Sequence, residues 1–126
     1  HGAAPLERFL DAGITVGIGS DSVASNNLCD MIEESRFAAL TARNRQDKNR
    51  FIQAKEMLRM ATLGGAEALG LDAKIGSLEA GKQADIAVIS LEHDTMQPLG
   101  DIEAAIVFSA SGRDVIMTFV NGVPVK

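Results

Sequence analysis

The stretch that decides the fold is Ile14-Thr15-Val16-Gly17-Ile18-Gly19-Ser20-Asp21-Ser22-Val23-Ala24-Ser25-Asn26-Asn27. It begins as an uncharged run rich in β-branched residues, which predicts a buried strand over residues 14–19. Asp21 stands where this strand ends, and α/β enzymes place catalytic and metal-binding groups at that position. By local pattern alone, however, such a carboxylate more often starts a turn or caps a helix. Evidence from the rest of the sequence is needed to choose between these two roles of Asp21.

The composition predicts a globular domain whose core is built from Ala, Leu, Ile, Val and Met. Of the 126 residues 46% are hydrophobic and only 4% aromatic, with no Trp and no Tyr. The net charge is −5 and no basic patch with aromatic residues is visible, which argues against nucleic-acid binding. The apolar runs are too short to cross a bilayer, so no membrane partner is expected. The single cysteine, Cys29, excludes an internal disulfide and fits a reducing compartment, and we expect a cytoplasmic protein.

The first part of the chain has helical patterns on both sides of the predicted strand. Helices are expected at about residues 4–12, 28–43, 52–63 and 66–69. Asn27 and Asp30 have the spacing of a capping box at the start of the second helix. A strand as apolar as residues 14–18 needs parallel neighbours on both sides, and the sequence offers none nearby. The chain begins at His1 rather than Met and shows no signal peptide, so a fragment of a larger protein is expected.

The second part of the chain changes to the patterns of strands and turns. Strands are expected at residues 84–89, 104–108 and 115–120, with a turn at 111–114. Asn121-Gly122 is a strong hairpin signal, and residues 123–125 are expected to return from it. The sequence therefore predicts an α/β part over residues 1–71 and a mainly antiparallel β part over residues 72–126.

Two nucleotide-binding motifs are approached but not met. Gly17-Ile18-Gly19 follows the predicted strand, but Ser22 replaces the third glycine of a dinucleotide motif and Asp21 would face the pyrophosphate. The stretch Gly76-Ser77-Leu78-Glu79-Ala80-Gly81-Lys82-Gln83 has the spacing of a P-loop. There, Gln83 replaces the Ser or Thr that holds magnesium, and a strand follows instead of a helix. The glycines of this second stretch are expected to shape turns, and those of the first to keep the strand end slim where a ligand approaches.

Four segments in this order resemble the amidohydrolase superfamily. They are Val16–Asn27 with Asp30–Glu34, Ala61–Gly70, Ile75–Ile86, and the closing hairpin around Asn121-Gly122. The resemblance is closest to the cytosine deaminase-like branch, which includes S-adenosylhomocysteine and methylthioadenosine deaminases, triazine chlorohydrolases and guanine deaminases. It implies the C-terminal fragment of a metal-dependent (β/α)8 TIM barrel. Residues 1–71 would be the last βα portion of the barrel, and residues 72–126 part of a small composite β-sandwich.

The resemblance also implies a metal site to which this chain contributes one residue. In the family one divalent metal ion, usually zinc or iron, activates a water and is held by a His-x-His pair, a third His and an Asp. Asp21 matches that Asp, which in the family binds the metal and takes a proton from the water. His1 would lie in a loop near the substrate. Ser22 and Asn26 are further candidates for substrate binding because of their polar groups, although helix capping would also explain Asn26.

The missing ligands limit what this chain is expected to do alone. It has no His-x-His pair, and a catalytic zinc needs about three protein ligands. The fragment is therefore expected to be inactive and without metal. The intact parent protein is expected to hydrolyse non-peptide C–N bonds or C–Cl bonds of a purine, pyrimidine or triazine, by deamination or dechlorination. An imidazolonepropionase-like cyclic amide hydrolase and a non-catalytic scaffold or subunit are the alternatives. Uncovered apolar strand edges also predict a homo-oligomer.

Overall fold

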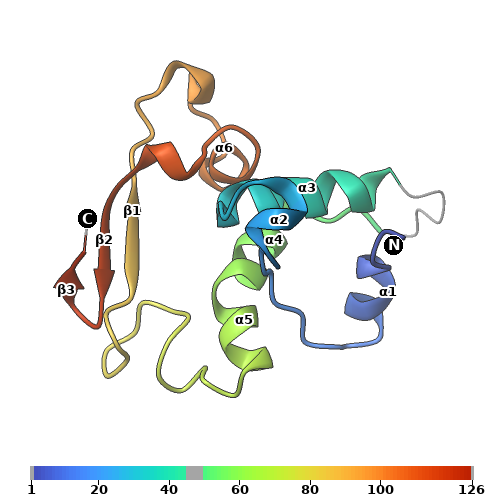
Figure 1. The fold of residues 1–126 in the computed structure, drawn as a ribbon, viewed down its shortest axis with the longest axis horizontal. Coiled ribbons are helices and arrows are strands. Elements are labelled where there is room, and N and C mark those ends of the chain that lie inside the picture. Colours follow the sequence, from blue (N-terminus) through green and yellow to red (C-terminus); the bar gives the residue numbers. More distant parts are fainter. Residues whose placement is uncertain (1, 45–49, 126) are drawn as a thin grey trace.

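The fold was analysed in a computed structural model, which describes residues 2–44 and 50–125. It is a mixed α/β structure in which the helices lie to one side of a small sheet (Figure 1). The elements in chain order are α1 (Leu6–Asp11), α2 (Val23–Asn26), α3 (Met31–Arg43), α4 (Ala54–Ala61), α5 (Leu63–Ala68), β1 (Ile86–Ile89), the short 3-10 helix η1 (Asp94–Met96), α6 (Ile102–Phe108), η2 (Gly112–Asp114), β2 (Val115–Val120) and β3 (Val123–Pro124). None of the helices within these described ranges is long and apolar enough to cross a membrane.

The core lies where α3, α4 and α6 meet. Ala39, Met57 and Val107, one from each of these helices, are fully buried there. α3 turns its small residues inward, with Ser35 and Ala42 also buried. Leu6 of α1 and Ile52 before α4 complete the same cluster. Among the described residues the core contains no buried aromatic side chain, in line with the aromatic-poor composition.

The sheet has the order β1-β2-β3, and both pairs are antiparallel. Residues 86 and 88 of β1 lie opposite residues 119 and 117 of β2. Asn121 and Gly122 connect β2 to β3 with φ values of 50° and 78°, as a two-residue hairpin turn of the type I′ class requires. The predicted hairpin and the strands on either side of residues 90–114 are therefore confirmed.

The strand predicted over residues 14–19 is absent. These residues form no secondary structure, and within the described part of the chain no strand pairs with them. The segment instead packs against the junction of α4 and α5, where the Ile18 amide donates to the Met60 carbonyl oxygen at 3.2 Å. A Cβ on Gly17 would lie 2.8 Å from the Gly65 Cα atom, so Gly17 serves close backbone packing. Residue preference favours extended backbone here, but a strand exists only where a neighbouring strand completes its hydrogen bonds.

The strand predicted over residues 104–108 is also wrong, because this segment is the helix α6. Asp101 caps the helix by accepting a hydrogen bond from the Ala104 amide at 2.7 Å. Val107 is completely buried, and α6 packs on both α3 and α4. A short, continuous apolar run fits a buried helix as well as a buried strand. Packing against the helical surface of α3 and α4 favours the helix.

The helix predicted over residues 28–43 begins three residues later, at Met31. Asp30 is its N-cap and accepts hydrogen bonds from the amides of Ile32 and Glu33 at 3.0 and 3.3 Å. Asn27 does not cap this helix; it ends α2 in a left-handed conformation with φ 65°. The sequence signal was Asp30-Met31-Ile32-Glu33, which has the spacing of a capping box one turn later than the one we expected.

Asp30, the N-cap of α3, and Arg36 within α3 bind the segment of residues 107–112 to the helical core. The second carboxylate oxygen of Asp30 accepts a hydrogen bond from the Gly112 amide at 2.6 Å. Arg36 donates from Nε to the Val107 carbonyl oxygen at 3.1 Å and from its terminal nitrogen to the carbonyl oxygen of Ala110. These contacts join residues that are 71 to 82 positions apart in the chain.

Candidate functional site

Asp21 lies on an exposed loop between the segment 14–20 and the short helix α2. Its backbone is left-handed, with φ 55°, a conformation that few residues other than glycine adopt and that Asp tolerates. Its Oδ2 atom accepts a hydrogen bond from the Ser25 hydroxyl at 2.9 Å. The loop therefore presents a carboxylate at the surface and holds one of its two oxygens in place.

Ser22, a predicted substrate-binding residue, caps α2. Its hydroxyl oxygen accepts the Ala24 amide at 3.1 Å, while its carbonyl oxygen accepts the Ser25 amide at 2.8 Å. The capping role that the local pattern left open for Asp21 thus belongs to its neighbour. The side chain of Asp21 contacts this helix through the hydroxyl of Ser25.

Asn26, the other predicted substrate-binding residue in the described chain, links two helices. Its side-chain amide nitrogen donates to Oε1 of Glu34 on α3, and its side-chain oxygen accepts the Leu28 amide at 3.0 Å. Asn26 therefore has a structural role at the end of α2, and Glu34 is a residue that the sequence analysis did not single out. Asn26 and Glu34 are eight positions apart with a loop between them, so no helical or strand periodicity in the sequence predicts their contact. His1, the remaining candidate, lies outside the described residues.

A metal ion would find one suitable ligand on this loop. Carboxylate oxygens bind zinc and other divalent metals, so Asp21 fits as a single ligand. Among residues 2–44 and 50–125, however, no group of three or more His, Cys, Asp or Glu side chains could hold a metal ion. The described part of the chain therefore does not form a complete metal site.

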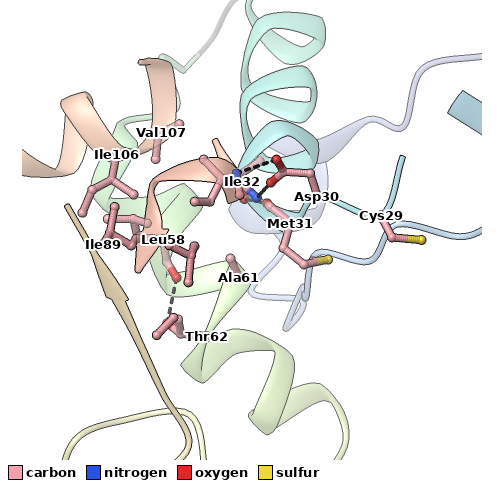
Figure 2. A pocket seen from close by; sticks show the side chains of 14 residues that line it. Cys29, Asp30, Met31, Ile32, Leu58, Ala61, Thr62, Ile89, Ile106 and Val107 are labelled. Atoms are coloured by element: carbon pink, nitrogen blue, oxygen red, sulfur yellow. Dashed lines mark hydrogen bonds between the residues drawn. The ribbon is translucent and has the colours of Figure 1, made fainter. Parts of the chain in front are cut away.

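A cavity of about 360 Å³ lies between the helices and the sheet (Figure 2). Its walls come from the start of α3, from α4, β1 and α6, and from the segment around η2; they include Met31, Ile32, Leu58, Ala61, Ile89, Ile106 and Val107. Asp21, Ser22 and Asn26 do not line it. Asp30 does, but both of its oxygens accept backbone amides, so this carboxylate anchors structure rather than a ligand. The cavity is apolar and offers a packing surface.

The glycine-rich stretch with P-loop spacing forms turns, as expected. Gly76 and Gly81 have φ values of 92° and 96°. The Ser77 hydroxyl donates to Glu79 at 2.6 Å and accepts Nζ of Lys82 at 2.6 Å. The hydrogen bond from Ser77, together with the charge of Lys82, lowers the pKa of the Glu79 carboxyl below its ordinary value. These side chains stabilise the turn among themselves.

Both the sequence and the structure of this chain are similar to those of known proteins. The model of the amidohydrolase family matches residues 1–125. The 5-methylthioadenosine/S-adenosylhomocysteine deaminase of Moorella thermoacetica is 45% identical over 121 residues, which are 96% of this chain and 28% of that enzyme. The deaminase of the same name from Thermococcus kodakarensis is 41% identical over 121 residues, with the same coverage of both chains.

Solved structures give the same result. An adenosine deaminase from Xanthomonas campestris with bound zinc superposes with a TM-score of 0.91 at 37% identity, over 96% of this chain and 28% of that one. Atrazine chlorohydrolase from Arthrobacter aurescens, complexed with zinc, superposes with a TM-score of 0.87 at 37% identity, over 98% of this chain and 27% of that one. The chain thus spans little more than a quarter of the length of the relatives it matches.

Proposed function

Because this chain belongs to the amidohydrolase family, we propose that it is the C-terminal part of a metal-dependent hydrolase acting on a nitrogen heterocycle. The proposed reaction is hydrolytic deamination or dechlorination of a ring carbon by an activated water. The names of the relatives support this choice, since they include deaminases of adenine-containing compounds and an atrazine chlorohydrolase. Two of their structures hold zinc, which supports a divalent metal in the parent protein.

In this proposal the segment 14–20 is the last strand of a TIM barrel, completed by neighbours from the rest of the parent protein. Its apolar side chains support this, because Ile14 is 51% exposed here and would be covered in a complete sheet. Residues 72–126, with their three-stranded antiparallel sheet, would belong to the composite β-sandwich. Asp21 would then stand at the carboxyl end of a barrel strand, where enzymes of this fold carry their catalytic groups.

The observation that carries the proposal is the geometry of Asp21. Its carboxylate is exposed at the end of that segment, and a left-handed backbone and one hydroxyl hold its orientation. A divalent metal, when bound, acts as a Lewis acid that lowers the pKa of water. Asp21 would contribute one carboxylate oxygen as a ligand and would accept a proton from the attacking water. Ser25, which donates to Oδ2, would hold the orientation of the carboxylate.

The test is Asp21→Asn in the full-length protein, with Asp72→Asn on the exposed surface as the matched control. We expect Asp21→Asn to lower the metal content after dialysis and to reduce kcat/KM by about 10²–10⁴-fold, the range typical of a lost proton-transfer group. The measurements are metal analysis and the release of ammonia or chloride from methylthioadenosine, S-adenosylhomocysteine and atrazine. Removing the metal with a chelator should abolish turnover, and adding zinc should restore it.

The proposal is wrong if Asp21→Asn keeps its metal and its activity. If the unmodified full-length protein binds no metal and turns over none of these compounds, the non-catalytic scaffold is the better description.

A further inference from the structure

We propose that Glu34 is a positioning residue that acts through Asn26 to fix the loop carrying Asp21. The inference rests on the proposed function, because it takes Asp21 as the metal ligand of the parent protein. Glu34 itself lies in the first turn of α3, and among the described residues its hydrogen bond is with Asn26 rather than with Asp21. What it holds is the far end of α2, the helix that follows Asp21.

The helix α2 needs such support because it has almost none of its own. It contains four residues, and none of them is buried. A helix this short is marginal in water, since a single turn gains few hydrogen bonds for the backbone it orders. Its position therefore depends on polar contacts at its ends. Asn26 makes two, one to the carboxylate of Glu34 and one to the Leu28 amide at 3.0 Å.

The helix α3, in contrast, is firmly placed. Asp30 caps its start and binds the Gly112 amide, and Arg36 binds the carbonyl oxygens of Val107 and Ala110. Ser35, directly after Glu34, is 2% exposed. A carboxylate on this helix is thus a fixed acceptor, and its charge strengthens the hydrogen bond from the Asn26 amide.

The connection from α2 to Asp21 is short. Ser25 is the neighbour of Asn26, and its hydroxyl donates to Oδ2 of Asp21 at 2.9 Å. Glu34 also lines a cavity of about 300 Å³ together with residues 16–19, the segment that leads into Asp21. Glu34 therefore lies beside the chain both before Asp21, at residues 16–19, and after it, at Asn26.

The test uses the full-length protein and compares Glu34→Ala with Glu33→Ala, a control in the same helical turn whose carboxylate makes no hydrogen bond among the described residues. We expect Glu34→Ala to weaken zinc retention about tenfold in competition with a chelator, as loss of an outer-shell partner does. In the metal-free protein, we expect the Leu28 amide to exchange its hydrogen about tenfold faster. Glu33→Ala should change neither quantity.

A second pair of variants separates positioning from general stability. Asn26→Asp places two carboxylates against each other and should have the same effects as Glu34→Ala. Combining Asn26→Asp with Glu34→Gln should rescue both quantities, because the introduced amide can donate to the introduced carboxylate, which still accepts the Leu28 amide. In an Asp21→Asn background, Glu34→Ala should weaken zinc retention no further, since its effect runs through Asp21.

The outcomes also distinguish this inference from the proposed function. If Asp21→Asn retains zinc like the unmodified protein, the proposed function fails. If Asp21→Asn loses zinc while Glu34→Ala retains it with unchanged exchange at Leu28, only the positioning role of Glu34 is overturned. It is likewise overturned if the combined variant gives no rescue, or if Glu34→Ala weakens zinc retention equally with and without Asp21.

Discussion

Gly17 shows how little room a single residue can have in this fold. A Cβ at this position would lie 2.8 Å from the Gly65 Cα atom, and one on Gly64 would lie 2.7 Å from the Val16 carbonyl oxygen. The segment 14–20 and the junction of α4 and α5 therefore approach each other backbone to backbone at these glycines. The slim backbone that we predicted at Gly17 is real, but it serves packing against α5. Gly19, in contrast, has open space where its side chain would be.

We therefore expect Gly17→Ala to lower the free energy of unfolding by about 1–3 kcal/mol, the usual cost of an overpacked contact. Gly19→Ala should change it by less than about 0.5 kcal/mol, since that position faces open space. Urea unfolding of the full-length variants measures both. Equal losses for the two substitutions would contradict the close backbone contact.

The start of α3 shows how an element depends on one carboxylate with two tasks. Asp30 satisfies the free amides at the helix start with one oxygen and the Gly112 amide with the other. Figure 2 shows this side chain at the edge of the apolar cavity, beside Met31 and Ile32. The cap orders α3, and the second bond places the segment before β2.

Two substitutions separate these tasks. Asp30→Ser keeps an N-capping oxygen but is too short to keep both contacts, whereas Asp30→Ala loses both. The lost cap alone should cost about 0.5–2 kcal/mol, so Asp30→Ala should unfold at lower denaturant than Asp30→Ser. Both variants should show faster exchange at the Gly112 amide. If Asp30→Ser protects that amide as well as the unmodified protein does, the second contact has been misassigned.

Elements with a clear period and their own caps could be predicted from the sequence. The repeat of apolar residues gave α3 and α4, and Asn121-Gly122 gave the hairpin. The two wrong strand predictions have a common physical cause, because in both cases a neighbouring element determines which of two structures with similar local preference forms. Residues 14–19 lack strand partners in the described chain, and residues 104–108 meet a helical surface that favours α6.

The candidate site was predictable only in part for the same reason. Asp21 could be singled out because its motif is contiguous and resembles a family pattern. The bond between Asn26 and Glu34 depends on how α2 folds back towards α3, which no spacing rule describes. Ser22 could have been identified as a cap, since Ser before a short helical turn is a common N-cap.

On the scale of the molecule, the sheet leaves apolar side chains uncovered. Ile116 and Met117 are neighbours on β2, so their side chains point to opposite faces of the sheet. They are 59% and 41% exposed, so each face leaves an apolar side chain uncovered. Val120, Val123 and Val125 of the hairpin are more than half exposed as well. Soluble monomers rarely expose contiguous apolar surface of this kind, so further protein is expected to cover it.

We therefore expect the 126-residue chain, when produced alone, to self-associate at micromolar concentration. Sedimentation velocity should show species larger than a monomer, and Ile116→Lys should reduce them by placing a charge on the sheet. The full-length protein should not depend on Ile116 in this way if its other segments cover the sheet. A stable monomer of the isolated chain would contradict the expectation.

The contacts of α3 and its N-cap with residues 107–112 can form only late in the synthesis of this chain. Asp30 and Arg36 bind partners that follow them by 71 to 82 positions. At about 5–20 residues per second, a ribosome needs roughly 4–16 s to add that length. During this interval the apolar face of α3 has neither α6 nor the 107–112 segment to pack on. The nascent chain therefore passes through a period in which a chaperone has an accessible helix surface to bind, and the period ends when Gly112 emerges.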